Sequence, residues 1–185
     1  VQGPLALKAM QKLTKEPIES MEYYTFKKID FAGIKDIIFS ITGYTGAGGC
    51  EIYCANEDAE KLWKAVFEAG AEFGIKPIGL GARDTLRLEM GYVLYGNDIN
   101  ESTSPLEAGL GWITKFVDHK NFIDKEYMLN LKTAGLKRKL VGFEMVDRGI
   151  PRQHYEIFDS QGNLIGEVTS GTMSPMMKIG VGMGY

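Results

Sequence analysis

Apolar residues recur at helical spacing in three stretches, residues 3–17, 56–74 and 124–131. Pro4 suits a first helical turn, where an N–H group would have no partner anyway. Asn56 and Asp124 are suited to N-capping the second and third stretches. We expect a helix in each, with one face of the first two packed in the core. The residues expected on those faces are Leu5, Ala9, Met10 and Leu13, followed by Ala59, Leu62, Trp63, Val66, Phe67, Gly70 and Phe73.

Strands are predicted where apolar and polar residues alternate over short distances. Two such segments, rich in aromatic and β-branched residues and joined by Ala32-Gly33, are typical of a β-hairpin. After residue 134 the pattern predicts strands only, with a turn at residues 160–163. We therefore expect an α+β fold, with a mixed sheet-and-helix domain over residues 1–134 and a small all-β domain over residues 135–185. The predicted strands are residues 23–31, 34–42, 112–116, 138–145, 153–159 and 164–170.

The stretch from residue 79 to residue 98 combines more charged and apolar residues than any other. If its first half is helical, one stripe faces the core and consists of Ala82, Leu86, Glu89 and Val93. A carboxylate on that stripe needs a partner. One interpretation pairs Glu89 with Arg83 or Arg87, and spacing alone somewhat favours it. The other lets Asp84 neutralise Arg87 and leaves Glu89 for a ligand.

Four glycines within residues 43–49 follow the second predicted strand. Glycine permits positive φ and the close approach of another group, so the loop is either a flexible turn or part of a binding site. It has neither the Lys-Ser/Thr ending of a P-loop nor GxGxxG spacing. A nucleotide site is therefore not expected.

Composition excludes several classes of protein. Of 185 residues, 44% are hydrophobic and 24% charged, as in ordinary globular proteins rather than disordered ones. The net charge of −3 offers no basic surface, so we expect no nucleic-acid partner. No apolar run reaches the length of a membrane span, and the first residues do not resemble a signal peptide. We expect no membrane association and an intracellular location.

The cysteines and histidines support neither metal nor nucleophile chemistry. Cys50 and Cys54 lie four residues apart on an extended segment, too far apart for an easy disulfide and without nearby histidines for zinc. We expect both to be small core residues. His119 and His154 are isolated, and nothing places them beside a serine or cysteine nucleophile. A Ser/His/Asp or Cys/His mechanism is therefore not expected.

Several motifs in order carry a family resemblance: QGP at residues 2–4, GYTG at 43–46, GARDTLRLEMGYVLYGND at 81–98, PLEAGLGW at 105–112 and VTSGTMSP at 168–175. Together they resemble the T-protein of the glycine cleavage system, a tetrahydrofolate-dependent aminomethyltransferase. Single pieces are weak, but the ordered set is specific and covers nearly the whole chain. Ala47 stands where the family pattern has Glu after GYTG.

The resemblance implies a folate-binding domain followed by a small β-barrel domain that is incomplete here. It also implies that the chain lacks an N-terminal part, which carries the family's catalytic Asp, and the extreme C-terminus. On this basis the chain alone should be inactive. The resemblance places the pteridine ring of folate on Glu89.

Three further residues are candidates for folate contact. Tyr44 is expected to line the folate channel, or else to pack as an ordinary tyrosine. Lys115 is the basic residue nearest to PLEAGLGW, and the commoner explanation for it is a solvated lysine. Arg152, in the loop of residues 147–152, suits the carboxylates of the folate tail, or is simply exposed.

The reaction implied by the resemblance transfers a one-carbon unit from an aminomethyl group to tetrahydrofolate, with release of ammonia. The aminomethyl group is attached to the dihydrolipoyl arm of the H-protein, the expected partner. The location implied is cytoplasmic in a bacterium or the mitochondrial matrix in a eukaryote. Two alternatives stay open: the C-terminal region of a folate-dependent demethylating oxidase or dehydrogenase, and a non-catalytic folate-binding module.

Overall fold

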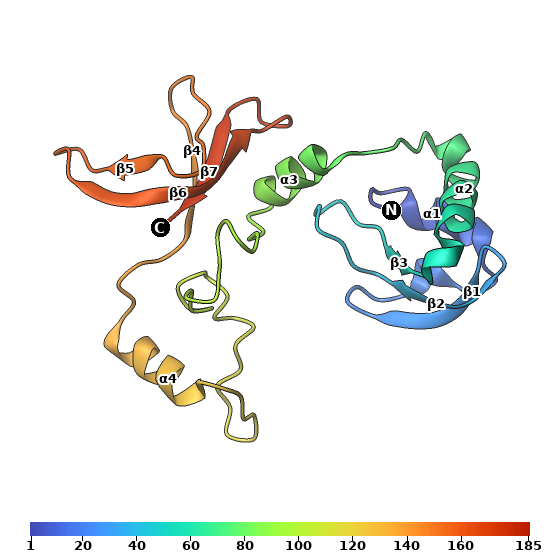
Figure 1. Ribbon diagram of the computed structural model, residues 1–185, viewed down its shortest axis with the longest axis horizontal. Helices are drawn as coiled ribbons and strands as arrows, with labels where there is room; N and C mark the ends of the chain where they lie inside the picture. The colour runs from blue at the N-terminus through green and yellow to red at the C-terminus, as the bar shows by residue number, and fades with distance from the viewer. The chain divides into compact units, whose positions relative to one another are not determined.

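The computed structural model describes residues 1–185 and contains two compact units, Val1–Leu86 and Arg87–Tyr185. Each unit combines helices with an antiparallel sheet, so the α+β prediction is confirmed (Figure 1). The units divide by compactness after Leu86. The domain boundary expected after residue 134 stays a prediction. A division into compact units does not test where one family domain ends and the next begins.

The first unit is built on a three-stranded sheet of order β1-β2-β3 (Figure 1). Its strands are β1 (Phe26–Phe31), β2 (Ile34–Ser40) and β3 (Glu51–Tyr53). The α-helices are α1 (Ala6–Met10) and α2 (Ala59–Gly70), and the short 3-10 helices are η1 (Gln11–Leu13), η2 (Ile18–Ser20), η3 (Asn56–Asp58) and η4 (Ala71–Phe73). One core joins the sheet to both α-helices, and its largest members are Met10, Ile18, Phe31, Ile37 and Phe39.

The β1–β2 hairpin confirms the strand prediction, and its turn shows why the connection is short. Ala32 and Gly33 have φ angles of 53° and 69°, the positive values that a two-residue hairpin turn requires. Phe31 and Ile34 face each other across the turn.

Cys50 is buried as expected, and burial raises the pKa of its thiol to about 11.

The helices of the first unit differ from their prediction in detail. Leu5 precedes α1 and is 49% exposed, and Trp63 of α2 is 61% exposed, so neither belongs to the core. Trp63 instead packs against the ring of Phe67, with centroids 4.7 Å apart. Asn56 makes no capping hydrogen bond, because η3 precedes α2. The helical segment ends as predicted at Gly74, whose φ of 70° is left-handed.

The second unit contains a four-stranded antiparallel sheet of order β4-β7-β6-β5 (Figure 1). Its strands are β4 (Val141–Glu144), β5 (Glu156–Phe158), β6 (Leu164–Met173) and β7 (Gly180–Gly184). The sheet is open and does not close into a barrel. Helix α3 (Leu80–Glu89) ends in this unit, and helix α4 (Lys125–Ala134) confirms the third predicted helix. Asp124 precedes α4 without a side-chain capping bond.

One strand prediction in the second unit is wrong, and strand β7 is not among the predicted strands. Residues 112–116 form turns rather than a strand, because Ile113 and Thr114 donate backbone hydrogen bonds back to Leu110 and Gly111. Strand β7 lies between β4 and β6 although three of its five residues are glycine. It provides Val181 and Met183 to a small core with Leu88 of α3.

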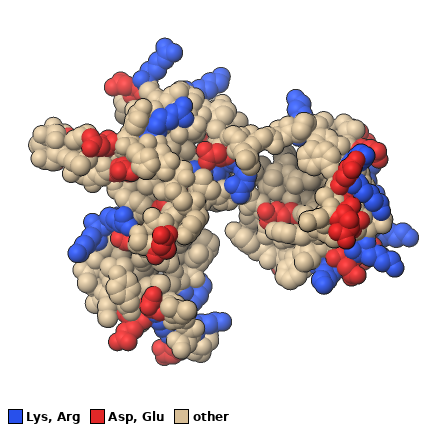
Figure 2. All heavy atoms as spheres, in the orientation of Figure 1, with Lys and Arg blue, Asp and Glu red and all other residues tan.

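The surface carries both signs of charge. In the view of Figure 2, Lys and Arg side chains are interspersed with Asp and Glu on each unit, consistent with the net charge of −3. None of the helices combines the length and apolar character needed to cross a bilayer.

Candidate functional site

Helix α3 ends at Glu89, earlier than the predicted stripe assumed. Gly91 adopts a φ of 68°, and the N–H of Tyr92 donates to the carbonyl of Arg87 at 2.9 Å, which closes the helix. Val93 therefore lies outside the helix, and the stripe prediction is wrong. The buried residues at this end are Arg87 and Leu88, whereas Glu89 is only half-buried.

Arg87 is held by a buried carboxylate that the sequence did not single out. Its Nη1 lies 2.7 Å from Oδ2 of Asp98, and both side chains are almost completely buried. Nη1 also donates to the carbonyl of Tyr92 at 3.1 Å, and Nη2 donates to Oγ of Ser170 on β6 at 2.8 Å. These bonds compensate the cost of burying a guanidinium group. They join the end of α3 to the sheet of the second unit.

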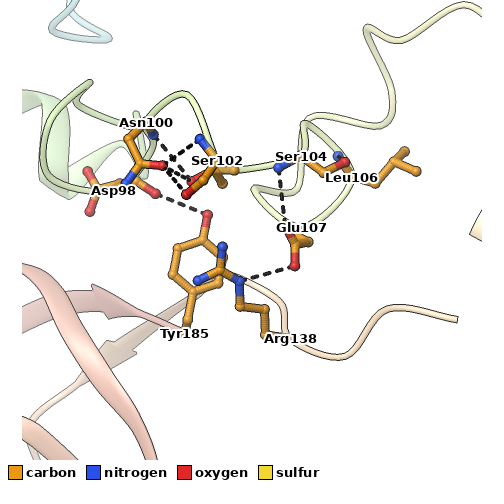
Figure 3. A network of polar contacts seen from close by, with 9 residues as sticks. Asp98, Asn100, Ser102, Ser104, Leu106, Glu107, Arg138 and Tyr185 are labelled. Carbon is orange, nitrogen blue, oxygen red and sulfur yellow. Dashed lines mark hydrogen bonds and ion pairs between the residues drawn. The ribbon is translucent and has the colours of Figure 1, made fainter. Parts of the chain in front are cut away.

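Asp98 has its remaining acceptor sites filled in the same way. The N–H of Leu94 donates to Oδ2 at 2.9 Å, and the Thr169 hydroxyl donates to Oδ1. The phenol of Tyr185 donates to the backbone carbonyl of Asp98 at 3.0 Å (Figure 3). Burial raises the pKa of Tyr185 above its ordinary value. The loop that follows α3 is therefore anchored at both side chain and backbone.

A second group of contacts fixes residues 104–107. Oε2 of Glu107 accepts the N–H of Ser104 at 3.1 Å, and Oε1 pairs with Nε of Arg138 at 3.1 Å (Figure 3). The Arg138 guanidinium also lies over the ring of Tyr185, 4.6 Å from its centroid. These contacts hold the PLEAGLGW segment in place. The role of these residues is therefore structural.

Glu89 is paired with neither of the arginines considered for it. Its Oε1 accepts hydrogen bonds from the hydroxyl of Ser174 and from the N–H of Met176, the latter at 3.2 Å. Oε2 accepts none within the chain. A carboxylate oxygen has two lone-pair sites, so Oε1 is filled and Oε2 retains its full accepting capacity. The geometry makes Glu89 a half-buried carboxylate with one open oxygen.

Of the other candidate residues, Lys115 and Arg152 form no hydrogen bond or ion pair with Glu89. Tyr44 belongs to the first unit, where the guanidinium of Arg83 lies 4.4 Å from its ring centroid. Lys115 is exposed and its Nζ donates to the carbonyl of Trp112 at 3.0 Å. Arg152 is exposed and forms no ion pair. Their predicted roles toward a ligand stay predictions.

Sequence reasoning missed Asp98, Thr169, Ser170 and Ser174 as members of the contact networks around Arg87 and Glu89. A signal was present, because all four lie inside the motifs at residues 81–98 and 168–175. Motif membership did not say which residues would meet. That information is tertiary, since Ser174 and Glu89 are 85 positions apart.

Comparisons with known proteins cover most of the chain. A family described as GCVT N-terminal domain matches residues 1–118. A second, described as Glycine cleavage T-protein C-terminal barrel domain, matches residues 138–185. The two matches follow in the order in which the motifs occur.

Individual relatives agree with the family matches. Proteins named Aminomethyltransferase from Bacteroides fragilis and Flavobacterium psychrophilum are 65% and 62% identical over 185 residues, which is 100% of this chain and 51% of each relative. A crystal structure of glycine cleavage system aminomethyltransferase T from Bartonella henselae matches with a TM-score of 0.80 at 32% identity, over 90% of this chain and 45% of that one. The chain thus spans about half the length of the curated relatives it matches.

Proposed function

The chain belongs to the glycine cleavage T-protein family, and from this premise we propose that the protein containing it is an aminomethyltransferase. The reaction transfers a one-carbon unit from the aminomethyl-lipoyl arm of the H-protein to tetrahydrofolate and releases ammonia. The observation that carries the proposal is the ordered match of both T-protein domains along the chain. The names and identities of the relatives support it, and their bacterial sources favour the bacterial cytoplasm as the location.

The proposed chemistry requires no protein nucleophile, because a nitrogen atom of folate attacks the one-carbon unit. The protein must instead bind two reactants in a reactive orientation. Such positioning contributes about 7 to 11 kcal/mol in favourable cases. We expect the family's catalytic aspartate outside these 185 residues, so the roles assigned here are binding roles.

We assign the pteridine ring of tetrahydrofolate to Glu89. The ring presents an amino group and an N–H group side by side, and both donate hydrogen bonds. Oε2 is the carboxylate oxygen that accepts no bond within the chain, whereas Oε1 already accepts two. A negative acceptor makes these hydrogen bonds stronger than neutral ones. Oε2 is therefore the atom proposed to receive the ring.

The remaining candidates keep the roles expected from the family. Tyr44 is proposed to line the folate channel. Lys115 and Arg152 are proposed to pair with the carboxylates of the folate tail. Both cations are exposed and free of ion pairs with the chain's own carboxylates, which leaves their charge available to an anionic ligand.

The sharpest test of the site is Glu89→Gln in the complete protein. Glutamine keeps the side-chain size and an oxygen for Ser174, but it replaces Oε2 with an NH₂ group that faces the donors of the ring. We expect the Kd for tetrahydrofolate, measured by calorimetry without oxygen, to rise about 10- to 150-fold, equivalent to about 1.5 to 3 kcal/mol.

A matched control is Glu144→Gln on β4, which removes an exposed carboxylate elsewhere in the second unit. It should leave the Kd unchanged. An unchanged Kd for Glu89→Gln would remove Glu89 from the site. The activity itself is tested by ammonia release from aminomethyl-loaded H-protein, and folate binding without ammonia release would favour a non-catalytic folate-binding module.

A further inference from the structure

The connection between β6 and β7, residues 174–179, is organised around Ser174. This residue is completely buried. Its backbone N–H donates to the carbonyl of Ile179 at 2.8 Å, and its own carbonyl accepts the backbone N–H of Lys178 at 2.9 Å. Its hydroxyl oxygen accepts the N–H of Met177 at 2.9 Å. The conformation of the connection therefore fixes the position of the hydroxyl group.

The hydroxyl proton has one destination, Oε1 of Glu89. A serine hydroxyl has one proton to donate, and the N–H of Met177 already occupies an acceptor site of its oxygen. The N–H of Met176, from the same connection, gives Oε1 a second hydrogen bond. Two donors from the β6–β7 connection thus hold a single oxygen of the carboxylate.

This arrangement restricts a side chain that is otherwise mobile. The terminal torsion of a glutamate is broad and roughly two-fold, so a carboxylate near a helix end samples many orientations. With Oε1 held, rotation about that torsion is blocked and Oε2 points in one direction. Fixing a binding group beforehand reduces the ordering cost of binding.

We propose that Ser174 is a positioning residue for the pteridine ring, which acts by orienting Glu89 so that Oε2 receives the ring donors. This inference rests on the folate-binding role proposed for Glu89. The competing explanation is that the Ser174–Glu89 bond only attaches the β6–β7 connection to α3. The two explanations differ in whether the effect of Ser174 on ligand affinity depends on the carboxylate.

The experiment is a double-mutant cycle of Ser174→Ala and Glu89→Ala in the complete protein, with the Kd for tetrahydrofolate as the readout. With Glu89 present, Ser174→Ala should raise the Kd about 5- to 10-fold, the size of one typical intramolecular hydrogen bond. With Glu89→Ala, adding Ser174→Ala should change the Kd less than about twofold, because no carboxylate is left to orient.

Two further variants guard against a folding defect. Ser174→Cys keeps the approximate size of the side chain but donates only weakly, so its Kd should lie between those of the wild type and Ser174→Ala. Ser170→Ala is the matched control, because it removes another buried serine hydroxyl, on the adjoining strand β6, one that contacts Arg87 and not Glu89. It should lower the melting temperature and leave the Kd within about twofold of the wild type.

The inference is overturned if Ser174→Ala binds tetrahydrofolate as tightly as the wild type, or more tightly, while Glu89→Gln binds weakly. It is also overturned if Ser174→Ala weakens binding equally with and without the carboxylate, as an indirect structural effect would. An unchanged Kd in Glu89→Gln is a different result, because it removes the folate role of Glu89 itself.

Discussion

The buried Arg87–Asp98 pair offers the most informative perturbation of stability. Asp98→Asn preserves the shape of the side chain and removes its charge. The Thr169 hydroxyl also lies 3.2 Å from the carbonyl of Met183, so it can donate there and accept from the new amide. The amide oxygen can then keep the bonds from Arg87 and Leu94. Asp98→Asn is therefore close to a pure charge deletion.

The expected cost follows from what Arg87 retains. After the substitution its guanidinium stays buried and loses the charged partner at 2.7 Å, while the acceptors of Tyr92 and Ser170 and the amide oxygen that replaces Oδ2 are neutral. Removing one member of a buried ion pair costs about 3 to 5 kcal/mol. We expect Asp98→Asn near the lower end of that range. Asp98→Ala, which also leaves the N–H of Leu94 without its acceptor, should lie near the upper end.

The assay is urea unfolding of the complete protein, with hydrogen exchange of residues 87–98 and 164–173 measured by mass spectrometry to locate the loss. The double variant Arg87→Met with Asp98→Asn should cost less than the sum of the two single variants by about 2 kcal/mol or more, because methionine removes the buried charge that Asp98 pairs with. A cost below about 1 kcal/mol for Asp98→Asn, or simple additivity, would refute the reasoning.

Two other predictions concern the open sheet and its last residue. Gly182→Ala should lower the free energy of unfolding by about 1 to 3 kcal/mol in thermal unfolding, because its Cβ would lie 2.5 Å from Cζ of Phe143. Gly142→Ala on the neighbouring strand should be close to neutral, because the atom nearest to its Cβ would lie 3.9 Å away. Equal losses in the two variants would contradict this reasoning. Burial raises the pKa of Tyr185 above 10.0, so its stabilising contribution is complete below pH 10 and is lost as the pH rises through the folded-state value. Unfolding midpoints should therefore fall more steeply above about pH 10 in the wild type than in Tyr185→Phe, and parallel curves would argue against it.

The candidate site was only partly accessible from the sequence. The order of the motifs identified Glu89 as a candidate ligand-binding carboxylate. Helical spacing suggested only Arg83 and Arg87 as its partners within the chain. The structure assigns it Ser174 and Met176 instead. Arg87 likewise pairs with Asp98, which lies eleven positions later in the sequence and beyond the end of the helix. Helical spacing describes neighbours within one helix, so it had no means of finding partners in the loop after α3 or in the β6–β7 connection.

What the sequence determined by itself was the local structure that near neighbours control: the hairpin turn at Ala32-Gly33, the end of the second helical segment at Gly74, and the α+β order of elements. Tertiary structure decided the placement of β7. A strand of sequence GVGMG has a weak local preference for extended structure, because glycine has no side chain to pack. It lies between β4 and β6, where a Cβ added to Gly180, Gly182 or Gly184 would lie less than 3.0 Å from atoms of other segments, so only glycine fits there.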